Sequence, residues 1–238
     1  MKRLQSKVAL VTGASKGIGF AIARSFAEEG CGVMLCARTE QDLRDAAETL
    51  QSLGASIAFR AADVSVPGDV DGLVKSTLKQ FGHIDILVNN AGIGIFKEVD
   101  RLSDEEWKHT LATNLTGPFY LMRACLPLMK KQRSGHIINI SSLAGQNPFA
   151  GGSAYCASKF GLNGLTECVM LEARSHNIKV TLVCPGSVDT TFAGDRREKP
   201  SWKVAPEDIG RLCVEIVLLS GPTLVSKYEV RPVSPPKK

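Results

Sequence analysis

Residues 8–19 read Val-Ala-Leu-Val-Thr-Gly-Ala-Ser-Lys-Gly-Ile-Gly, and this stretch decides the fold class. Its first five residues form a short apolar run, which is typical of a strand buried on both faces. Three glycines follow, and a segment with helical spacing then runs to about residue 29. A buried strand that turns through glycines into a helix is the opening unit of an α/β sheet.

The same alternation of short apolar runs and longer helical segments repeats along the chain. We expect strands at residues 8–12, 32–37, 56–61, 86–89, 136–141, 179–184 and 224–230. We expect helices near residues 17–29, 40–53, 69–80, 104–131, 155–176 and 206–219. Each connection is long enough to hold a helix, so neighbouring strands can run parallel. The sequence therefore predicts an α/β fold, a single Rossmann-type doubly wound sheet of about seven mostly parallel strands with helices on both faces.

Local signals refine these elements. Ser103 and Glu106 form a capping-box pattern at the start of the fourth helix, and Pro118 and Pro127 predict a kink or interruption within it. No linker divides the chain, so we expect one domain over residues 1–232 and a flexible tail over 233–238. The long irregular segment 187–205 would lie at the carboxyl ends of the strands, where loops commonly cover a ligand.

Composition excludes several classes of protein. Apolar residues make up 44% of the 238 residues and charged residues 22%, which is typical of a globular chain and not of a disordered, collagen-like or coiled-coil one. The net charge of +5 is spread too widely for a nucleic-acid surface. Without a membrane-length apolar run or a signal-peptide pattern, we expect a cytoplasmic protein with no membrane partner. The seven cysteines include no C-x-x-C pair, which favours free thiols and no metal site.

The glycine turn between the first strand and the first helix predicts a nucleotide site. Glycines at 13, 17 and 19 would let a pyrophosphate approach the backbone N–H groups at the start of the helix. An NAD-binding chain would present an acidic residue at the end of the second strand, but here Arg38 follows. With Lys16, Arg38 supplies positive charge for a 2′-phosphate and favours NADP over NAD. The alternative is that both are solvated surface cations, and Glu40 lies nearby.

A second group of residues predicts acid/base chemistry. Ser142 ends the fifth strand, and Tyr155 and Lys159 are spaced to share one face of the following helix. For Tyr155 to exchange a proton at neutral pH its pKa must fall by roughly 3 units, about 4 kcal/mol. An ammonium about 4 Å away supplies an energy of that order at an effective dielectric constant near 20. On this spacing alone, an ordinary exposed Tyr/Lys pair is the alternative.

In combination these motifs resemble the classical short-chain dehydrogenases/reductases, including members of the 3-oxoacyl-acyl-carrier-protein reductase type. The resemblance covers about residues 6–220 and rests on the glycine motif Thr12–Gly19, Asn89-Asn-Ala-Gly92, Asn114, Ser142, Tyr155-x-x-x-Lys159 and Pro185-Gly186 followed by Val188 and Thr190. It implies that Tyr155 is the acid/base and that Lys159 lowers the pKa of Tyr155 and holds the nicotinamide ribose. It further implies that Ser142 binds the substrate oxygen and that Asn114 anchors a water relay. The implied cofactor-binding residues are Gly13, Ser15, Lys16, Gly17, Ile18, Gly19, Arg38, Asp63, Val64, Asn90, Ala91, Gly92, Tyr155, Lys159, Pro185, Gly186, Val188 and Thr190.

The resemblance implies an NADP(H)-dependent oxidoreductase that transfers hydride between nicotinamide and a carbonyl compound or secondary alcohol, acting as a carbonyl reductase on a small molecule. A 3-oxoacyl-acyl-carrier-protein reductase is one alternative, and a non-catalytic nucleotide-binding protein is another. Family members commonly end in a Gly-Gly tail that helps to build a tetramer, whereas this chain reads Tyr228-Glu-Val-Arg-Pro232. We therefore expect a homo-oligomer and leave homodimer and homotetramer open.

Overall fold

In a computed structural model, which describes residues 2–193 and 202–234, seven strands form one sheet in which every pairing is parallel. The strand order is β3-β2-β1-β4-β5-β6-β7. The strands are β1 (Val8–Thr12), β2 (Gly32–Ala37), β3 (Ile57–Ala61), β4 (Ile86–Asn89), β5 (Gly135–Ile140), β6 (Ile178–Pro185) and β7 (Lys227–Val230). The doubly wound sheet predicted from the sequence is confirmed, and its strands are parallel throughout rather than mostly so.

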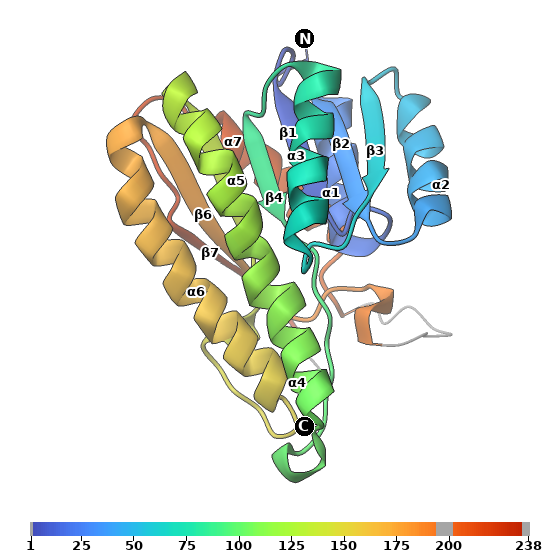
Figure 1. The fold of residues 1–238 in the computed structure, drawn as a ribbon, viewed down its shortest axis with the longest axis vertical. Helices are drawn as coiled ribbons and strands as arrows, with labels where there is room; N and C mark the ends of the chain where they lie inside the picture. Colours follow the sequence, from blue (N-terminus) through green and yellow to red (C-terminus); the bar gives the residue numbers. More distant parts are fainter. Residues whose placement is uncertain (1, 194–201, 235–238) are drawn as a thin grey trace.

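Helices cover both faces of the sheet (Figure 1). The described helices are α1 (Gly17–Glu28), α2 (Glu40–Gln51), α3 (Pro67–Phe81), α4 (Asp104–Leu111), α5 (Gly117–Gln132), α6 (Ser153–Ala173) and α7 (Pro206–Leu218). One apolar core lies between the sheet and α1, α2 and α7, and a second lies between the opposite face and α3, α5 and α6. All five residues of β1 are buried because this central strand has a core on each side.

The strand order creates a crevice at one edge of the sheet. The chain moves outward from β1 to β3 and then returns to place β4 on the other side of β1. The connections that follow β1 and β4 therefore separate at the carboxyl ends of two adjacent strands. In an open α/β sheet, ligands bind in the crevice at this reversal point.

The first six strands agree with the sequence prediction to within one residue at each end, whereas β7 is shorter than expected. The capping box at the start of α4 is confirmed, since Ser103 Oγ accepts from the Glu106 N–H and the Glu106 carboxylate accepts from the Ser103 N–H. The expected fourth helix is divided, but the break is a π-helical turn, Ala112–Thr116, that precedes both prolines instead of lying at either of them. Pro118 occupies the first turn of α5, which tolerates a missing N–H, and Pro127 lies inside α5 without ending it.

Several expectations concern residues at the margins of the structure. Part of the expected cover, residues 194–201, and the end of the expected tail, residues 235–238, lie outside the described residues.

The seven cysteines, all of them described, are free thiols, and six are buried. Within the described ranges, no helix is both long and apolar enough to cross a membrane, and no group of three or more His, Cys, Asp or Glu side chains could hold a metal ion.

One buried histidine gives a test of the fold at acid pH. Burial, helped by the charge of Lys179, lowers the pKa of His136 from 6.5 to about 3, while its Nε2 lies 2.8 Å from Thr181 Oγ1. The unfolded chain therefore takes up a proton first, so this contribution to stability is present above about pH 6.5 and is lost as the pH falls toward 3. We expect His136→Gln to reduce the loss of unfolding free energy between pH 7 and pH 4 by about 3 kcal/mol in urea titrations. Equal acid sensitivity of the two proteins would contradict this.

Candidate active site

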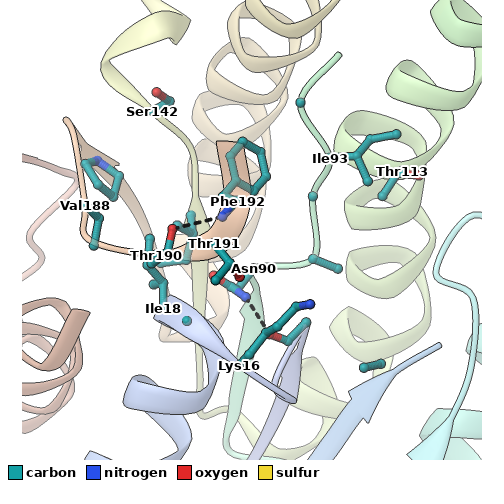
Figure 2. A pocket seen from close by; sticks show the side chains of 18 of the residues that line it. Lys16, Ile18, Asn90, Ile93, Thr113, Ser142, Val188, Thr190, Thr191 and Phe192 are labelled. Carbon is teal, nitrogen blue, oxygen red and sulfur yellow. Dashed lines mark hydrogen bonds between the residues drawn. The ribbon is translucent and has the colours of Figure 1, made fainter. Parts of the chain in front are cut away.

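A pocket of about 760 Å³ lies at the carboxyl-terminal edge of the sheet. Its walls come from the connections after β1 to β6 and from the first turns of α6 (Figure 2). The structure brings nearly all the sequence-predicted site residues to this pocket: Gly13, Ser15, Lys16, Gly17, Ile18, Arg38, Asp63, Val64, Asn90, Ala91, Gly92, Ser142, Tyr155, Lys159, Pro185, Gly186, Val188 and Thr190. Gly19 and Asn114 lie behind this lining and support it.

The glycine turn is held by very close backbone packing. Gly13 has a φ of +61°, and a Cβ on Gly19 would lie 2.2 Å from the Gly13 carbonyl oxygen. Asn90 fixes the turn from outside, since its Nδ2 donates to the carbonyls of Thr12 at 2.9 Å and of Gly13 at 3.1 Å. Side chains at either glycine position would push the turn open. The structure therefore requires glycine at both positions because the turn packs closely on itself and against Asn90.

The first turn of α1 is suited to an anion. Its N-cap residue, Lys16, makes no side-chain cap hydrogen bond, and the turn contains no acidic residue. The first N–H groups of a helix have no partner within the helix and carry the positive end of its dipole. A phosphate group can therefore accept hydrogen bonds there, at the end of the pocket lined by Lys16, Gly17 and Ile18.

Arg38 and Lys16 add positive charge at the same end of the pocket. Neither takes part in an ion pair with another residue of the part of the chain that the structure describes. Burial alone would raise the pKa of Asp63, but hydrogen bonds from Ser65 and the charge of Arg38 hold it below its ordinary value. Asp42 also lines this end. Sequence reasoning missed Asp42 because nothing in its helical spacing points to a ligand.

The other end of the pocket contains Ser142, Tyr155 and Lys159. Ser142 follows β5 and caps a short turn, where its Oγ accepts from the Ala144 N–H at 3.1 Å. Tyr155 lies in the first turn of α6, and its hydroxyl is close enough to the Ser142 side chain for Ser142 to lower its pKa. Lys159 lies one turn further along, with its Nζ 5.8 Å from the centre of the Tyr155 ring. The predicted juxtaposition of a hydroxyl, a phenol and an ammonium is present.

Lys159 is a buried cation with only 4% of its surface exposed. Its Nζ donates to the Ile140 carbonyl at 2.9 Å. Burial lowers the pKa of Lys159 to about 8, because a charged ammonium loses solvation in this position. Since 8 is above neutral pH, Lys159 is mostly protonated at pH 7.

The expected depression of the Tyr155 pKa by Lys159 is not found in this arrangement. Burial raises the pKa of Tyr155, and the Ser142 side chain lowers it by a smaller amount. The Lys159 ammonium is directed to the Ile140 carbonyl and lies beside the Tyr155 ring. Sequence spacing places the two residues on one helix face but does not fix the distance between ammonium and phenol oxygen.

Asn114 lies in the π-helical turn between α4 and α5. Its Oδ1 accepts from the Ile93 N–H at 2.8 Å, and its Nδ2 donates to the Ile93 carbonyl and to Ser158 Oγ. A Cβ on Gly92 would lie 3.3 Å from Asn114 Oδ1 and 3.8 Å from Lys159 Nζ, so the two groups border the same small space. Asn114 thus fixes the connection after β4 against the first turns of α6.

The pocket also contains apolar residues that sequence reasoning did not assign to the site. They are Ile93, Gly94 and Phe96 after β4, and the polar residue Thr113 of the π-helical turn also lines the pocket. Phe192 and Trp202, noted in the sequence only as parts of the cover, line the pocket as well. No spacing rule connects residues from separate connections, so only their position in space reveals them.

Comparisons with known proteins agree with this geometry. A family model described as short chain dehydrogenase matches residues 7–201. The chain is 39% identical to a sepiapterin reductase of Chlorobaculum tepidum over 95% of this chain and 96% of the relative. Among solved structures, an alcohol dehydrogenase of the archaeon Thermococcus sibiricus complexed with 5-hydroxy-NADP superposes with a TM-score of 0.91, at 31% identity over 98% of this chain and 99% of that chain. A metagenomic short-chain oxidoreductase in complex with NADP gives a TM-score of 0.87, at 38% identity over 98% and 100%.

The role of Asn90 in holding the glycine turn can be tested by measuring the free energy of unfolding of variants. Asn90→Ala leaves the Thr12 and Gly13 carbonyls without their side-chain donor, which should lower the free energy of unfolding by about 1–3 kcal/mol. Asn147→Ala is the matched control, because it removes one exposed amide that donates to the Leu143 carbonyl. Urea denaturation of both variants measures the difference. Equal losses would show that Asn90 does not brace the turn.

Proposed function

The chain belongs to the short-chain dehydrogenase family of oxidoreductases, and we propose that it transfers hydride between NADP(H) and a carbonyl compound or secondary alcohol, acting as a carbonyl reductase. One observation carries the proposal: Ser142, Tyr155 and Lys159 meet at one end of a pocket whose other end is the glycine turn. A pocket of about 760 Å³ falls in the size range of small-molecule and cofactor sites.

The residues at the glycine end fit a dinucleotide. The uncapped first turn of α1 would hold the pyrophosphate, and Asp63 and Val64, which follow β3, would flank the adenine. Asn90, Ala91 and Gly92 would line the middle of the cofactor, and the connection Pro185–Thr190 would cover its nicotinamide end. When bound, this cofactor supplies or accepts the hydride, and the protein contributes position and charge.

Tyr155 and Ser142 would act on the substrate oxygen. As a carbonyl group is reduced, the Tyr155 hydroxyl donates its proton to the oxygen, and in the reverse direction the Tyr155 oxygen accepts it. Ser142, which lines the same end of the pocket as Tyr155, would hold the substrate oxygen beside the phenol. Burial favours the protonated phenol, which is the form that donates to a carbonyl oxygen.

Lys159 and Asn114 would support the proton transfer. Lys159 remains mostly protonated at pH 7 and stabilises negative charge that develops on Tyr155. Its Nζ already donates to Ile140, and an ammonium has three donors, so two remain for a ribose hydroxyl or a water. Asn114 Oδ1 borders the same space and can accept from that water, which gives Lys159 a path for proton exchange.

Arg38 and Lys16 favour NADP(H) over NAD(H). Both line the glycine end of the pocket, where the sequence of an NAD-binding chain would supply a carboxylate. A guanidinium binds a phosphate through paired, charge-assisted hydrogen bonds. Asp42 and Asp63 line the same end and oppose a phosphate, so the preference depends on the two cations outweighing these two carboxylates.

The cytoplasmic location and the homodimeric or homotetrameric state stay predictions. Exposed aromatic rings on α4 and α5, those of Trp107 and Phe119, supply apolar surface of the kind that subunit contacts use.

Removing the phenol hydroxyl tests the proposed acid/base. Tyr155→Phe should lower kcat/KM for NADPH-dependent ketone reduction by about 10²–10⁴-fold, since a positioned acid contributes an effect of that size. NADPH affinity should stay within a few-fold, as measured by fluorescence titration. Tyr120→Phe on α5, outside the pocket, is the matched control and should retain full activity. If a broad panel of ketones and aldehydes gives no NADPH oxidation with the parent protein, the proposed reaction is wrong.

Reversing the charge at Arg38 tests the cofactor preference. Arg38→Asp should lower the NADPH/NADH ratio of kcat/KM by about 10–100-fold, because a charge-assisted contact of about 1.5–3 kcal/mol is lost. Arg24→Asp on α1 makes the same charge change outside the pocket and should leave the ratio near its parent value. A ratio that does not fall in Arg38→Asp would show that Arg38 does not bind the 2′-phosphate.

A further inference from the structure

Two phenylalanine rings lie against Tyr155, and a third packs against one of them. The Tyr155 ring lies 5.5 Å from that of Phe96, edge-on at 72°, and 5.8 Å from that of Phe192 at 53°. Phe96 in turn lies 5.8 Å from Phe149. These separations fall within the range in which aromatic rings attract each other in offset or edge-to-face pairs. The ring that carries the proposed acid/base thus lies within an aromatic cluster, defined here as Phe96, Phe149, Tyr155 and Phe192.

The phenylalanines of this cluster come from three different connections. Phe96 follows β4, Phe149 follows β5 and Phe192 follows β6, so three adjacent strands each deliver one ring to the same place. They remain 44%, 47% and 44% exposed, respectively. Single exposed apolar residues are ordinary, but a contiguous exposed patch in a pocket is typical of a binding site.

Gly94 lets two of the rings converge. A Cβ at this position would lie 2.7 Å from Phe96 Cζ and 2.8 Å from Phe192 Cε1. Both rings also line the pocket, and Figure 2 shows Phe192 beside Thr190 and Thr191 in the connection after β6. The rings therefore border the space next to the proposed reacting atoms.

We propose that Phe96 and Phe192 form an aromatic subsite that selects carbonyl compounds with a planar aromatic ring attached to the reacting carbon, namely aryl ketones and aryl aldehydes. The inference rests on the proposed function, since it names the substrate class of the same site. Both phenylalanines contact the Tyr155 ring, so a ring stacked on them holds its attached carbonyl near the Tyr155 hydroxyl. A saturated ring of the same size gains apolar contact but loses the quadrupole attraction between aromatic rings.

A matched pair of substrates tests this selection. Acetophenone and cyclohexyl methyl ketone carry an aromatic and a saturated six-membered ring on the same acetyl group. Their intrinsic reactivities differ, but this difference cancels when the ratio of kcat/KM values is compared between the parent protein and a variant. We expect Phe96→Leu and Phe192→Leu each to lower the aryl-to-cyclohexyl ratio about 2- to 12-fold, mainly through KM for acetophenone. Phe119→Leu changes an exposed ring of α5 outside the pocket and should leave the ratio unchanged.

Equilibrium binding separates the subsite from the reaction. Calorimetric titration with 1-phenylethanol and 1-cyclohexylethanol should show tighter binding of the aryl alcohol to the parent protein, and loss of that preference in both leucine variants. Turnover of both ketones with ratios unchanged in both variants would overturn the aromatic subsite and leave the proposed function standing. Aryl-selective binding that depends on Phe96 and Phe192, without turnover of any ketone, would support the subsite and overturn the reaction. Absence of aryl preference in both measurements would overturn the subsite.

The alternative is that Phe96 and Phe192 have only a structural role in packing the pocket wall. If Phe96 and Phe192 only stabilise the fold, the leucine variants should lower the thermal midpoint and reduce turnover of both ketones in equal proportion. That result would also overturn the subsite. Because each ring is nearly half exposed, leucine at either position should permit folding, and the two variants test the subsite independently.

Discussion

The site depends on one hydrogen-bond network between the ends of β1 and β4, the adjacent strands at which the order of strand connection reverses. Thr12 Oγ1 accepts from the backbone N–H groups of Asn90 and Ala91 and donates to the Val88 carbonyl, while the Asn90 amide donates back to the Thr12 and Gly13 carbonyls. This reciprocal set of hydrogen bonds joins the glycine turn to the end of β4. It holds the two walls of the crevice at a fixed separation, so a nucleotide can meet a preformed site.

From this hydrogen-bond network, the pocket divides into ends of different chemistry. Toward β2 and β3 it is charged, with Lys16, Arg38 and Asp63 beside an uncapped helix. Toward β5 and β6 it combines a few polar groups with exposed aromatic rings. A phosphate-rich cofactor and an apolar substrate can then bind in one cavity without competing for the same residues. Parallel strands produce this division because every connection that follows a strand emerges at the same edge.

Lys159 shows how the fold accommodates a buried charge, whose loss of solvation is unfavourable. A buried ammonium loses solvation, yet only one of its three donors is satisfied by the backbone, at Ile140. The π-helical turn places Asn114 nearby and lets it fix the connection that contains Ile93. A π-helical turn inside a longer helix frequently marks a functional position, and here it supports the residues around the lysine at the expense of regular helix geometry.

Sequence by itself determined the doubly wound sheet and its first six strands to within a residue at each end, and nearly all the site residues that it predicted line the pocket. It could do so because apolar periodicity and glycine turns act locally along the chain. Only the tertiary structure decided that the long fourth helix is interrupted at Ala112–Thr116, that burial raises the pKa of Tyr155, and that Phe96, Phe149 and Phe192 meet. Solvation of a group and contact between separate connections depend on neighbours distant in sequence, and local spacing carries no information about them.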